Sequence, residues 1–292
     1  MRVGLHALGI GAGARPDVIR AVAVAAEAAG FATLWAGEHV VLVDQPGSRY
    51  PYSADGRIAV PADADWLDPL LALSYVAAAT STIGLATGVL LLPEHNPVVA
   101  AKQAATLDVL SGGRLTLGIG IGWSAEEYAA LGVPFARRGR RIAEYVEAMR
   151  TLWSDDVATF SGEYTRFTSV RVNPKPLRNR RLPVVIGGNG DASLARVAAF
   201  GDGWYGFNLP LAAVQDRIAT LAEQCGRRHR DPRDLTVAVA LADATPADLP
   251  YLAAIGVTEV VLVAAPPPDP AAAAPWLRDL AARWQVTAGR GR

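Results

Sequence analysis

The chain has 292 residues, of which 51% are hydrophobic, and its 28 basic side chains balance 28 acidic ones. This length predicts one or two domains, and the apolar fraction is ample for a large buried core. Because there is no excess of Lys and Arg to neutralise phosphates, the composition argues against a nucleic-acid binder.

The single cysteine, Cys225, excludes an internal disulfide and fits a reducing cytosol. The first residues, MRVGLHALG, are typical of a strand and not of a signal peptide. No apolar run continues for the roughly 18 residues that a membrane span needs. We therefore expect a cytoplasmic protein whose partner is a small molecule, with no contact to a membrane.

Short apolar runs alternate along the chain with longer segments of helical period. The expected strands are residues 2–8, 33–39, 83–92, 114–120, 183–188, 203–207, 235–241 and 259–265. The expected helices are residues 16–29, 67–80, 97–110, 125–131, 137–153, 191–199, 211–228, 247–254 and 271–285. Eight such units in fewer than 300 residues predict an α/β fold, a single (β/α)8 TIM barrel domain over residues 1–292. A doubly wound sheet uses the same alternation and is the alternative.

Two long segments interrupt this rhythm. Residues 41–66 follow the second strand and carry Tyr50, Tyr52 and Trp66. Long loops in compact domains are usually functional or disordered, and these aromatic side chains favour a lid or pocket wall that binds substrate. Residues 155–182 contain ATFSGEYTRF and VRVNPKPLR, which predict an extra hairpin before the fifth barrel strand.

In a barrel of this kind the chemistry gathers at the carboxyl ends of the strands. The second strand ends in Glu38 and His39. Neighbouring residues of a strand point in opposite directions, so we expect only one of the two to face the cavity. We choose His39 as the catalytic residue, because an imidazole exchanges protons near neutral pH. The alternative is a core histidine with a structural role.

The other histidines are weaker candidates. His6 lies inside the first strand and can point into the barrel mouth, His95 lies in a turn that can simply be exposed, and His229 is expected to be solvated. No HxH or HExxH spacing is present, so no metal site is predicted.

Glycines mark two strand ends. Gly187, Gly188 and Gly190 precede a helix that starts with Asp191, and a glycine backbone before free helix N–H groups favours a phosphate. The alternative is an ordinary turn with a capping aspartate. The stretch GIGIGW (118–123) lacks the spacing of a dinucleotide fingerprint and instead predicts a strand end with room for a flat ring.

Three stretches together resemble the luciferase-like monooxygenase family: FATLWAGEH, TIGLATGVLLLPEHNPVVAAKQAATLDVLSGGRLTLGIGIGW and PVVIGGNGDASLARVAAFGDGW. The resemblance covers about residues 2–207 and is greatest to the actinobacterial branch that uses the deazaflavin coenzyme F420. It implies a TIM barrel that holds the coenzyme at the carboxyl ends of the strands, in a homodimer.

The resemblance also implies roles for single residues. It places His39 and Glu38 at the coenzyme or substrate, and it implies a non-prolyl cis peptide behind the ring at Gly88–Val89, beside Thr87. The further cofactor-binding residues that it implies are Asn96, Trp123, Gly187, Gly188, Gly203 and Trp204. One departure is that ALGIGAGAR (7–15) holds no carboxylate, which speaks against the sugar-phosphate oxidation of some relatives.

These observations predict an F420-dependent oxidoreductase that transfers a hydride between the deazaflavin ring and a small organic substrate. The first alternative keeps the fold and uses FMN with molecular oxygen, as a monooxygenase. A flavoprotein without activity and a metal-dependent barrel hydrolase are further alternatives, the latter without ligand spacing to support it.

Overall fold

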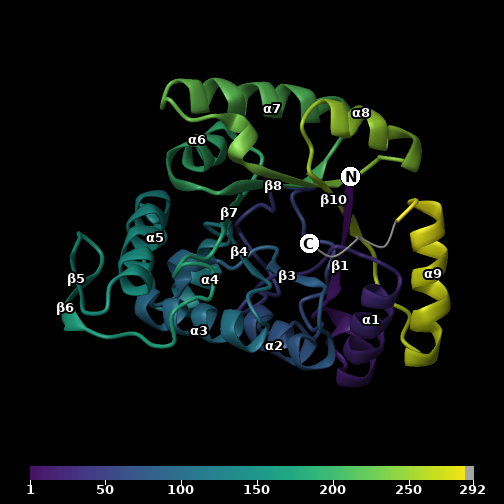
Figure 1. Ribbon diagram of the computed structural model, residues 1–292, viewed down its shortest axis with the longest axis horizontal. Helices are drawn as coiled ribbons and strands as arrows, with labels where there is room; N and C mark the ends of the chain where they lie inside the picture. Colours follow the sequence, from purple (N-terminus) through teal and green to yellow (C-terminus); the bar gives the residue numbers. More distant parts are fainter. Residues whose placement is uncertain (287–292) are drawn as a thin grey trace.

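The computed structural model describes residues 1–286, and in this part of the chain eight parallel strands close into a barrel (Figure 1). Around the barrel each strand pairs with its neighbours in the order β1-β10-β9-β8-β7-β4-β3-β2. The closed parallel barrel confirms the predicted TIM barrel and excludes the doubly wound sheet. The barrel strands are β1 (Arg2–Leu8), β2 (Thr33–Ala36), β3 (Gly84–Thr87), β4 (Leu115–Ile119), β7 (Val184–Gly187), β8 (Gly203–Leu209), β9 (Thr236–Leu241) and β10 (Glu259–Val263).

Helices surround the strands, and most begin and end within two residues of the predicted bounds. Pro16 starts α1, as its fixed φ angle favours. The helices are α1 (Pro16–Ala28), α2 (Pro69–Ala79), α3 (Pro97–Leu110), α4 (Ala125–Ala130), α5 (Arg138–Ser154), α6 (Asp191–Phe200), α7 (Leu211–Gly226), α8 (Leu249–Ala254) and α9 (Ala273–Arg283).

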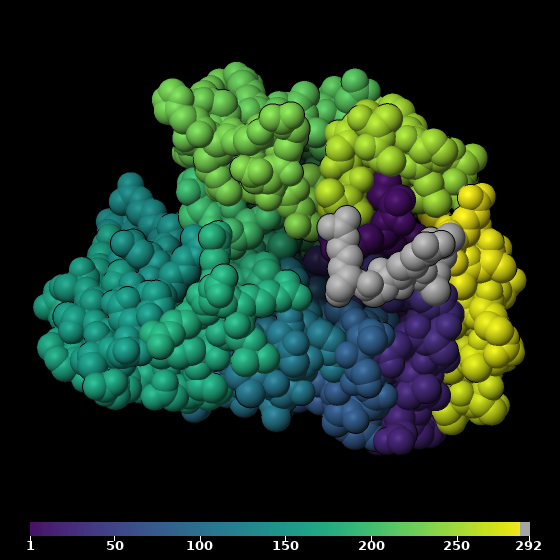
Figure 2. All heavy atoms as spheres, viewed as in Figure 1, coloured from purple at the N-terminus to yellow at the C-terminus, as the bar shows by residue number. Residues whose placement is uncertain are grey.

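The predicted extra hairpin is present between α5 and β7. It consists of β5 (Ala158–Ser161) and β6 (Arg166–Val170), which pair antiparallel. The hairpin forms one edge of the molecule, at the left of Figures 1 and 2, away from the barrel axis. It is fastened to α5 by the Glu144 carboxylate, which accepts three backbone N–H groups of the hairpin turn.

Two strands end three or more residues before their predicted bounds. The second ends at Ala36, and the third ends at Thr87 instead of continuing to residue 92. Leu85 pairs with Leu115, whereas Leu90 pairs with Ile119, so one extra residue is inserted on the β3 side. Such a bulge redirects the chain, and apolar composition alone cannot reveal it because the residues on both sides of it are buried.

Side chains fill the barrel interior and close its amino end. Trp35 and Tyr205 stack across the axis, with ring centroids 4.5 Å apart and planes 12° from parallel. Below them the Trp35 indole donates to the buried Glu259 carboxylate at 2.9 Å, and Arg2 lies 3.5 Å from the same carboxylate. A second layer of apolar side chains packs between the strands and the helices. The barrel is therefore blocked at one end, and access from outside is left to the carboxyl ends of the strands.

Candidate functional site

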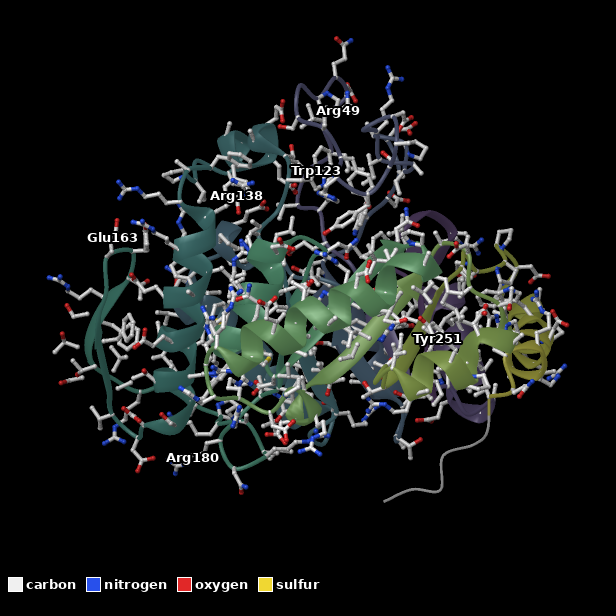
Figure 3. The ribbon with its side chains drawn as sticks, turned by 90° about the horizontal axis from the view of Figure 1, so that it is seen from above. Arg49, Trp123, Arg138, Glu163, Arg180 and Tyr251 are labelled. Carbon is white, nitrogen blue, oxygen red and sulfur yellow. The ribbon has the colours of Figure 1, made fainter. Side chains whose placement is uncertain are left out.

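The barrel mouth lies at the carboxyl ends of β3, β4, β7 and β8. In Figure 3 the loop that carries Arg49 stands above Trp123 at this end, and Arg180 lies at the opposite end. Gly88 and Val89 are partly exposed here, although the strand before them is buried. The peptide bond between them is cis, as the resemblance implies.

Val89 lies across the glycines of the two neighbouring strands. A Cβ atom at Gly120 would stand 2.6 Å from Val89 Cγ2, and one at Gly187 would stand 2.8 Å from Val89 Cγ1. Both distances are too short for any side chain, so these two positions need glycine for the chain to approach this closely. The Gly88–Val89 segment and the glycine strand ends together form a smooth floor at the mouth.

His39 is fixed at this mouth by a carboxylate from a distant part of the chain. Its Nδ1 lies 2.8 Å from Glu127 Oε2, and the two side chains are 7% and 0% exposed. Glu127 Oε1 also accepts the backbone N–H groups of Val40 and Val41, at 2.7 and 3.2 Å. A carboxylate has only acceptor oxygens, so the Nδ1 atom carries the proton. The Nε2 atom keeps its lone pair and accepts the Trp123 indole N–H at 3.4 Å.

The position of Glu127 follows from the start of α4. Ser124 caps this helix, and its Oγ accepts the Glu127 N–H at 3.1 Å. The preceding helical residue, Glu126, instead accepts Gly47 N–H and Ser48 N–H, at 2.7 and 3.0 Å. The two adjacent carboxylates thus fix two different parts of the chain that follows β2, and sequence reasoning identified neither.

Aromatic rings enclose His39 and continue across the mouth. Trp66 meets the imidazole edge-on at 4.9 Å and donates its indole N–H to Gly37 O, and Trp123 meets it at 5.8 Å. Tyr50 packs on Trp123, and Tyr52 packs on Tyr50, each with centroids 5.4 Å apart. The structure therefore brings together His39, Trp123 and the three aromatic residues of the 41–66 segment, with that segment lying over the mouth.

Glu38 faces away from His39, as the alternation of side chains predicted. Its carboxylate accepts Leu91 N–H and lies 2.9 Å from His95 Nε2. Burial alone would lower the pKa of His95, but the hydrogen bond and the charge of Glu38 outweigh it and raise that pKa. His95 is therefore held by an ion pair outside the mouth and is not simply exposed.

A third buried carboxylate, Glu94, lies between these two pairs. Neither of its oxygens has a hydrogen-bond partner in the described part of the chain. Burial, followed by repulsion from Glu127 and Glu38, raises the pKa of Glu94 to about 9. The Glu94 carboxyl group is therefore protonated at neutral pH and relieves the crowding of three negative charges.

The glycine corner after β7 has the form of an anion site. Gly188 has a φ of +114°, which favours glycine, and its carbonyl accepts the Trp204 indole N–H at 2.8 Å. Gly190 is the N-cap of α6 and provides no side chain, while the Asp191 carboxylate turns outward to Arg217 at 2.6 Å. The first backbone N–H groups of α6 are thus left without a side-chain acceptor, in the arrangement that binds phosphate groups in other proteins.

Five residues implied by the resemblance lie elsewhere or are already bonded, and two of them are Glu38 and Trp204, whose side chains are buried and hydrogen-bonded as described above. Gly203 lies at the amino end of β8, opposite the mouth, where a Cβ would stand 2.5 Å from Thr236 O, so we leave it out of the site. Thr87 is fully buried and donates to Gly118 O at 2.6 Å. The Asn96 carboxamide caps α3 by accepting Val98 N–H at 2.9 Å, and its contact with a cofactor stays a prediction.

Within residues 1–286, no group of His, Cys, Asp and Glu side chains is arranged to hold a metal ion. In the same range no helix combines the length and the apolar character needed to cross a membrane.

Comparison with known proteins identifies the family. A family model described as luciferase-like monooxygenase matches residues 3–248. The chain belongs to this family. An uncharacterised protein of Mycobacterium tuberculosis (strain ATCC 25618 / H37Rv) is 35% identical over 243 residues, which are 82% of this chain and 85% of the relative. Membership in this luciferase-like family supports an enzyme that carries out redox chemistry.

Solved structures of other proteins share the fold at low sequence identity. The monooxygenase RslO1 from Streptomyces bottropensis has a TM-score of 0.76 at 19% identity, with 98% of this chain and 99% of that chain covered. An F420-dependent secondary alcohol dehydrogenase, solved with an F420-acetone adduct, has a TM-score of 0.75 at 16% identity, with 97% and 98% covered. These two neighbours share the barrel and differ in the chemistry that their names state.

The buried Glu94 carboxyl group predicts a dependence of stability on pH. Its pKa is about 9 in the folded chain against an ordinary value of 4.5, so the folded chain binds one more proton between these values. The stabilisation from this proton is complete below pH 4.5 and is lost as pH rises toward 9. We expect Glu94→Gln, which keeps the shape and cannot titrate, to lose less unfolding free energy than the unmodified chain between pH 5 and 9.

Urea unfolding at pH 5, 7 and 9 measures this difference. Glu163→Gln makes the same replacement at an exposed residue of the hairpin turn and serves as the control. The prediction would be contradicted if the free energy of unfolding falls by the same amount between pH 5 and 9 in the unmodified chain and in Glu94→Gln.

Proposed function

We propose that this luciferase-like protein is a coenzyme F420-dependent oxidoreductase that transfers a hydride between the deazaflavin ring and a small organic substrate. One observation carries the proposal: an imidazole oriented by a buried carboxylate and a helix start without a side-chain cap stand at the same end of one barrel. Both features suit a flat redox coenzyme with a phosphate-bearing tail. The dehydrogenase neighbour, whose name states F420 dependence, supports the same coenzyme.

The residues at the mouth fit such a coenzyme. The smooth floor of Gly88 and Val89 suits the face of a planar ring, because no side chain rises from Gly120 or Gly187 beside it. The open N–H groups at the start of α6 suit the phosphate of the tail. Tyr50, Tyr52 and Trp66 would line the remaining space and contact the substrate.

The coenzyme, when bound, would supply the ring that accepts or donates the hydride. The chain supplies the proton transfer: His39 Nε2 takes the proton of a substrate hydroxyl group, or returns it in the reverse direction. Glu127 keeps Nδ1 protonated and stabilises the positive charge that the imidazole acquires. The aromatic segment over the mouth excludes water and holds the two reactants together.

The second candidate is a monooxygenase that uses FMN and molecular oxygen. The family description and the RslO1 structure favour it. The two candidates share the barrel, the glycine corner and His39, and they differ in whether the reduced ring meets oxygen or an organic hydride acceptor.

Binding and turnover with each coenzyme separate the candidates. The chain is titrated anaerobically with F420 and with FMN, and the change in its melting temperature and the oxygen uptake after reduction are measured. We expect F420 to raise the melting temperature and no oxygen uptake. Binding of FMN alone, followed by oxygen uptake, would replace the proposal with the second candidate, and binding of neither would overturn both.

The role of His39 predicts a selective loss of turnover. We expect His39→Gln to lower kcat by about 10²- to 10⁴-fold while the affinity for the coenzyme changes little, because general acid–base catalysis contributes about that much. His229→Gln, a replacement at an exposed histidine, is the matched control and should leave kcat unchanged. Equal turnover of the two variants would remove His39 from the mechanism.

We also propose that the chain is a cytoplasmic homodimer. The helix α2 is apolar on nearly all sides, which is typical of a helix covered on both faces. Exposed apolar side chains of α2 and its neighbour α3 would form the self-complementary surface: Leu71, Tyr75, Val99 and Leu110.

Light scattering tests the dimer. The unmodified chain should give twice the mass of one chain, and Leu71→Glu should give the monomer mass. A monomer mass for the unmodified chain would contradict the proposal.

A further inference from the structure

His6 is the second imidazole near the barrel mouth, and the mechanism above does not use it. It belongs to β1 and is 9% exposed, between the stacked aromatic layer and the mouth. A Cβ at Gly37 would stand 3.3 Å from His6 Nε2, and one at Gly88 would stand 3.3 Å from His6 Cε1. The imidazole therefore lies against the ends of β2 and β3, directly beside the floor on which we place the ring.

The hydrogen bond to Tyr205 determines which nitrogen of His6 carries the proton. The Tyr205 hydroxyl lies 3.1 Å from His6 Nδ1, and it has no other partner within residues 1–286. A buried hydroxyl needs an acceptor for its proton, and Nδ1 is the acceptor at hand. The Tyr205 O–H thus donates to Nδ1, and the single proton of the neutral imidazole lies on Nε2.

The charge state of His6 agrees with this assignment. Burial lowers the pKa of His6 to about 4, so the imidazole is neutral at physiological pH. Burial also raises the pKa of Tyr205, so its hydroxyl remains protonated and can donate. In the described part of the chain, no protein atom accepts a hydrogen bond from His6 Nε2.

We infer that His6 Nε2–H is a ligand-contacting donor that hydrogen-bonds a carbonyl-type oxygen of the molecule bound on Gly88 and Val89, with Tyr205 as the residue that fixes its tautomer. The inference rests on the proposed function, because it needs a ring or substrate at that floor. The two imidazoles then offer opposite hydrogen-bonding groups to a ligand: His39 presents an acceptor nitrogen, and neutral His6 presents a donor N–H. A ligand with a carbonyl oxygen beside Gly88 is favoured, and one with an N–H or a cation there is rejected.

The tautomer is tested without any ligand. Nitrogen NMR of the chain labelled with ¹⁵N at its four histidine rings reports which ring atom is protonated, and His6→Gln assigns the His6 signals. We expect an unprotonated Nδ1 and a protonated Nε2 that persist from pH 8 to about 5.5, and we expect Tyr205→Phe to abolish this fixed pattern. A proton on Nδ1, or a doubly protonated ring above pH 6, would overturn the inference.

The contact is tested by binding of F420 and of FMN, two molecules whose rings carry carbonyl oxygens. We expect His6→Leu to weaken binding of the coenzyme by about tenfold, the usual effect of one lost hydrogen bond, and His6→Gln to retain most of the affinity because its amide still donates. Tyr205→Phe should weaken binding less than His6→Leu, since the imidazole stays but is free to change tautomer. Circular dichroism of each variant checks that the barrel is folded. If His6→Leu does not fold, the affinities of His6→Gln and Tyr205→Phe still test the contact.

The outcomes separate this inference from the function on which it rests. Equal affinity of the unmodified chain and of His6→Leu would overturn the role of His6 and leave the coenzyme site in place. Failure of the unmodified chain to bind either coenzyme would overturn the proposed function and this inference with it.

Discussion

The buried carboxylate of Glu127 is the constraint on which the site depends. It binds the His39 imidazole and the next two backbone N–H groups, and so fixes the point where the chain leaves the second strand. Glu127 thereby orients the imidazole, and together with Glu126, which accepts Gly47 N–H and Ser48 N–H, it positions the aromatic segment over the barrel. The Glu127 contact leaves Nε2 of His39 as an acceptor nitrogen, which the Trp123 indole N–H approaches at 3.4 Å, and an acceptor nitrogen is what proton abstraction requires.

Burying the three carboxyl groups of Glu127, Glu38 and Glu94 near one another costs free energy, and the fold offsets this cost in a different way for each group. Glu127 is satisfied by three donors, and Glu38 is paired with His95. Glu94 instead keeps its proton, because burial disfavours its charged form and the charges of Glu127 and Glu38 repel a third one.

The order of strands and helices could be predicted from the sequence, because period and turn residues act locally. Pro16 and Pro97 mark helix starts that the structure confirms. The bulge after Thr87 could not be predicted, because the apolar residues on both sides of it resemble one continuous strand.

The candidate site was only partly accessible to sequence reasoning. His39 could be chosen because of its place at a strand end, and the cis bond at Gly88 could be inferred from resemblance. Glu127 could not, because two adjacent glutamates after a capping serine are typical of any helix start, and only tertiary contacts decide which one reaches His39. The placement of Gly203 was misleading for a similar reason, since a glycine needed for close strand packing looks the same in sequence as one that approaches a ligand.

The most direct test of the account is a crystal structure of the chain with F420 or FMN bound. The account predicts the ring face against Gly88 and Val89, His39 Nε2 within hydrogen-bond reach of the reacting side, and the phosphate at the N–H groups that begin α6. A coenzyme bound elsewhere on the chain, or a ring at the mouth with His39 turned away from it, would contradict the central claim.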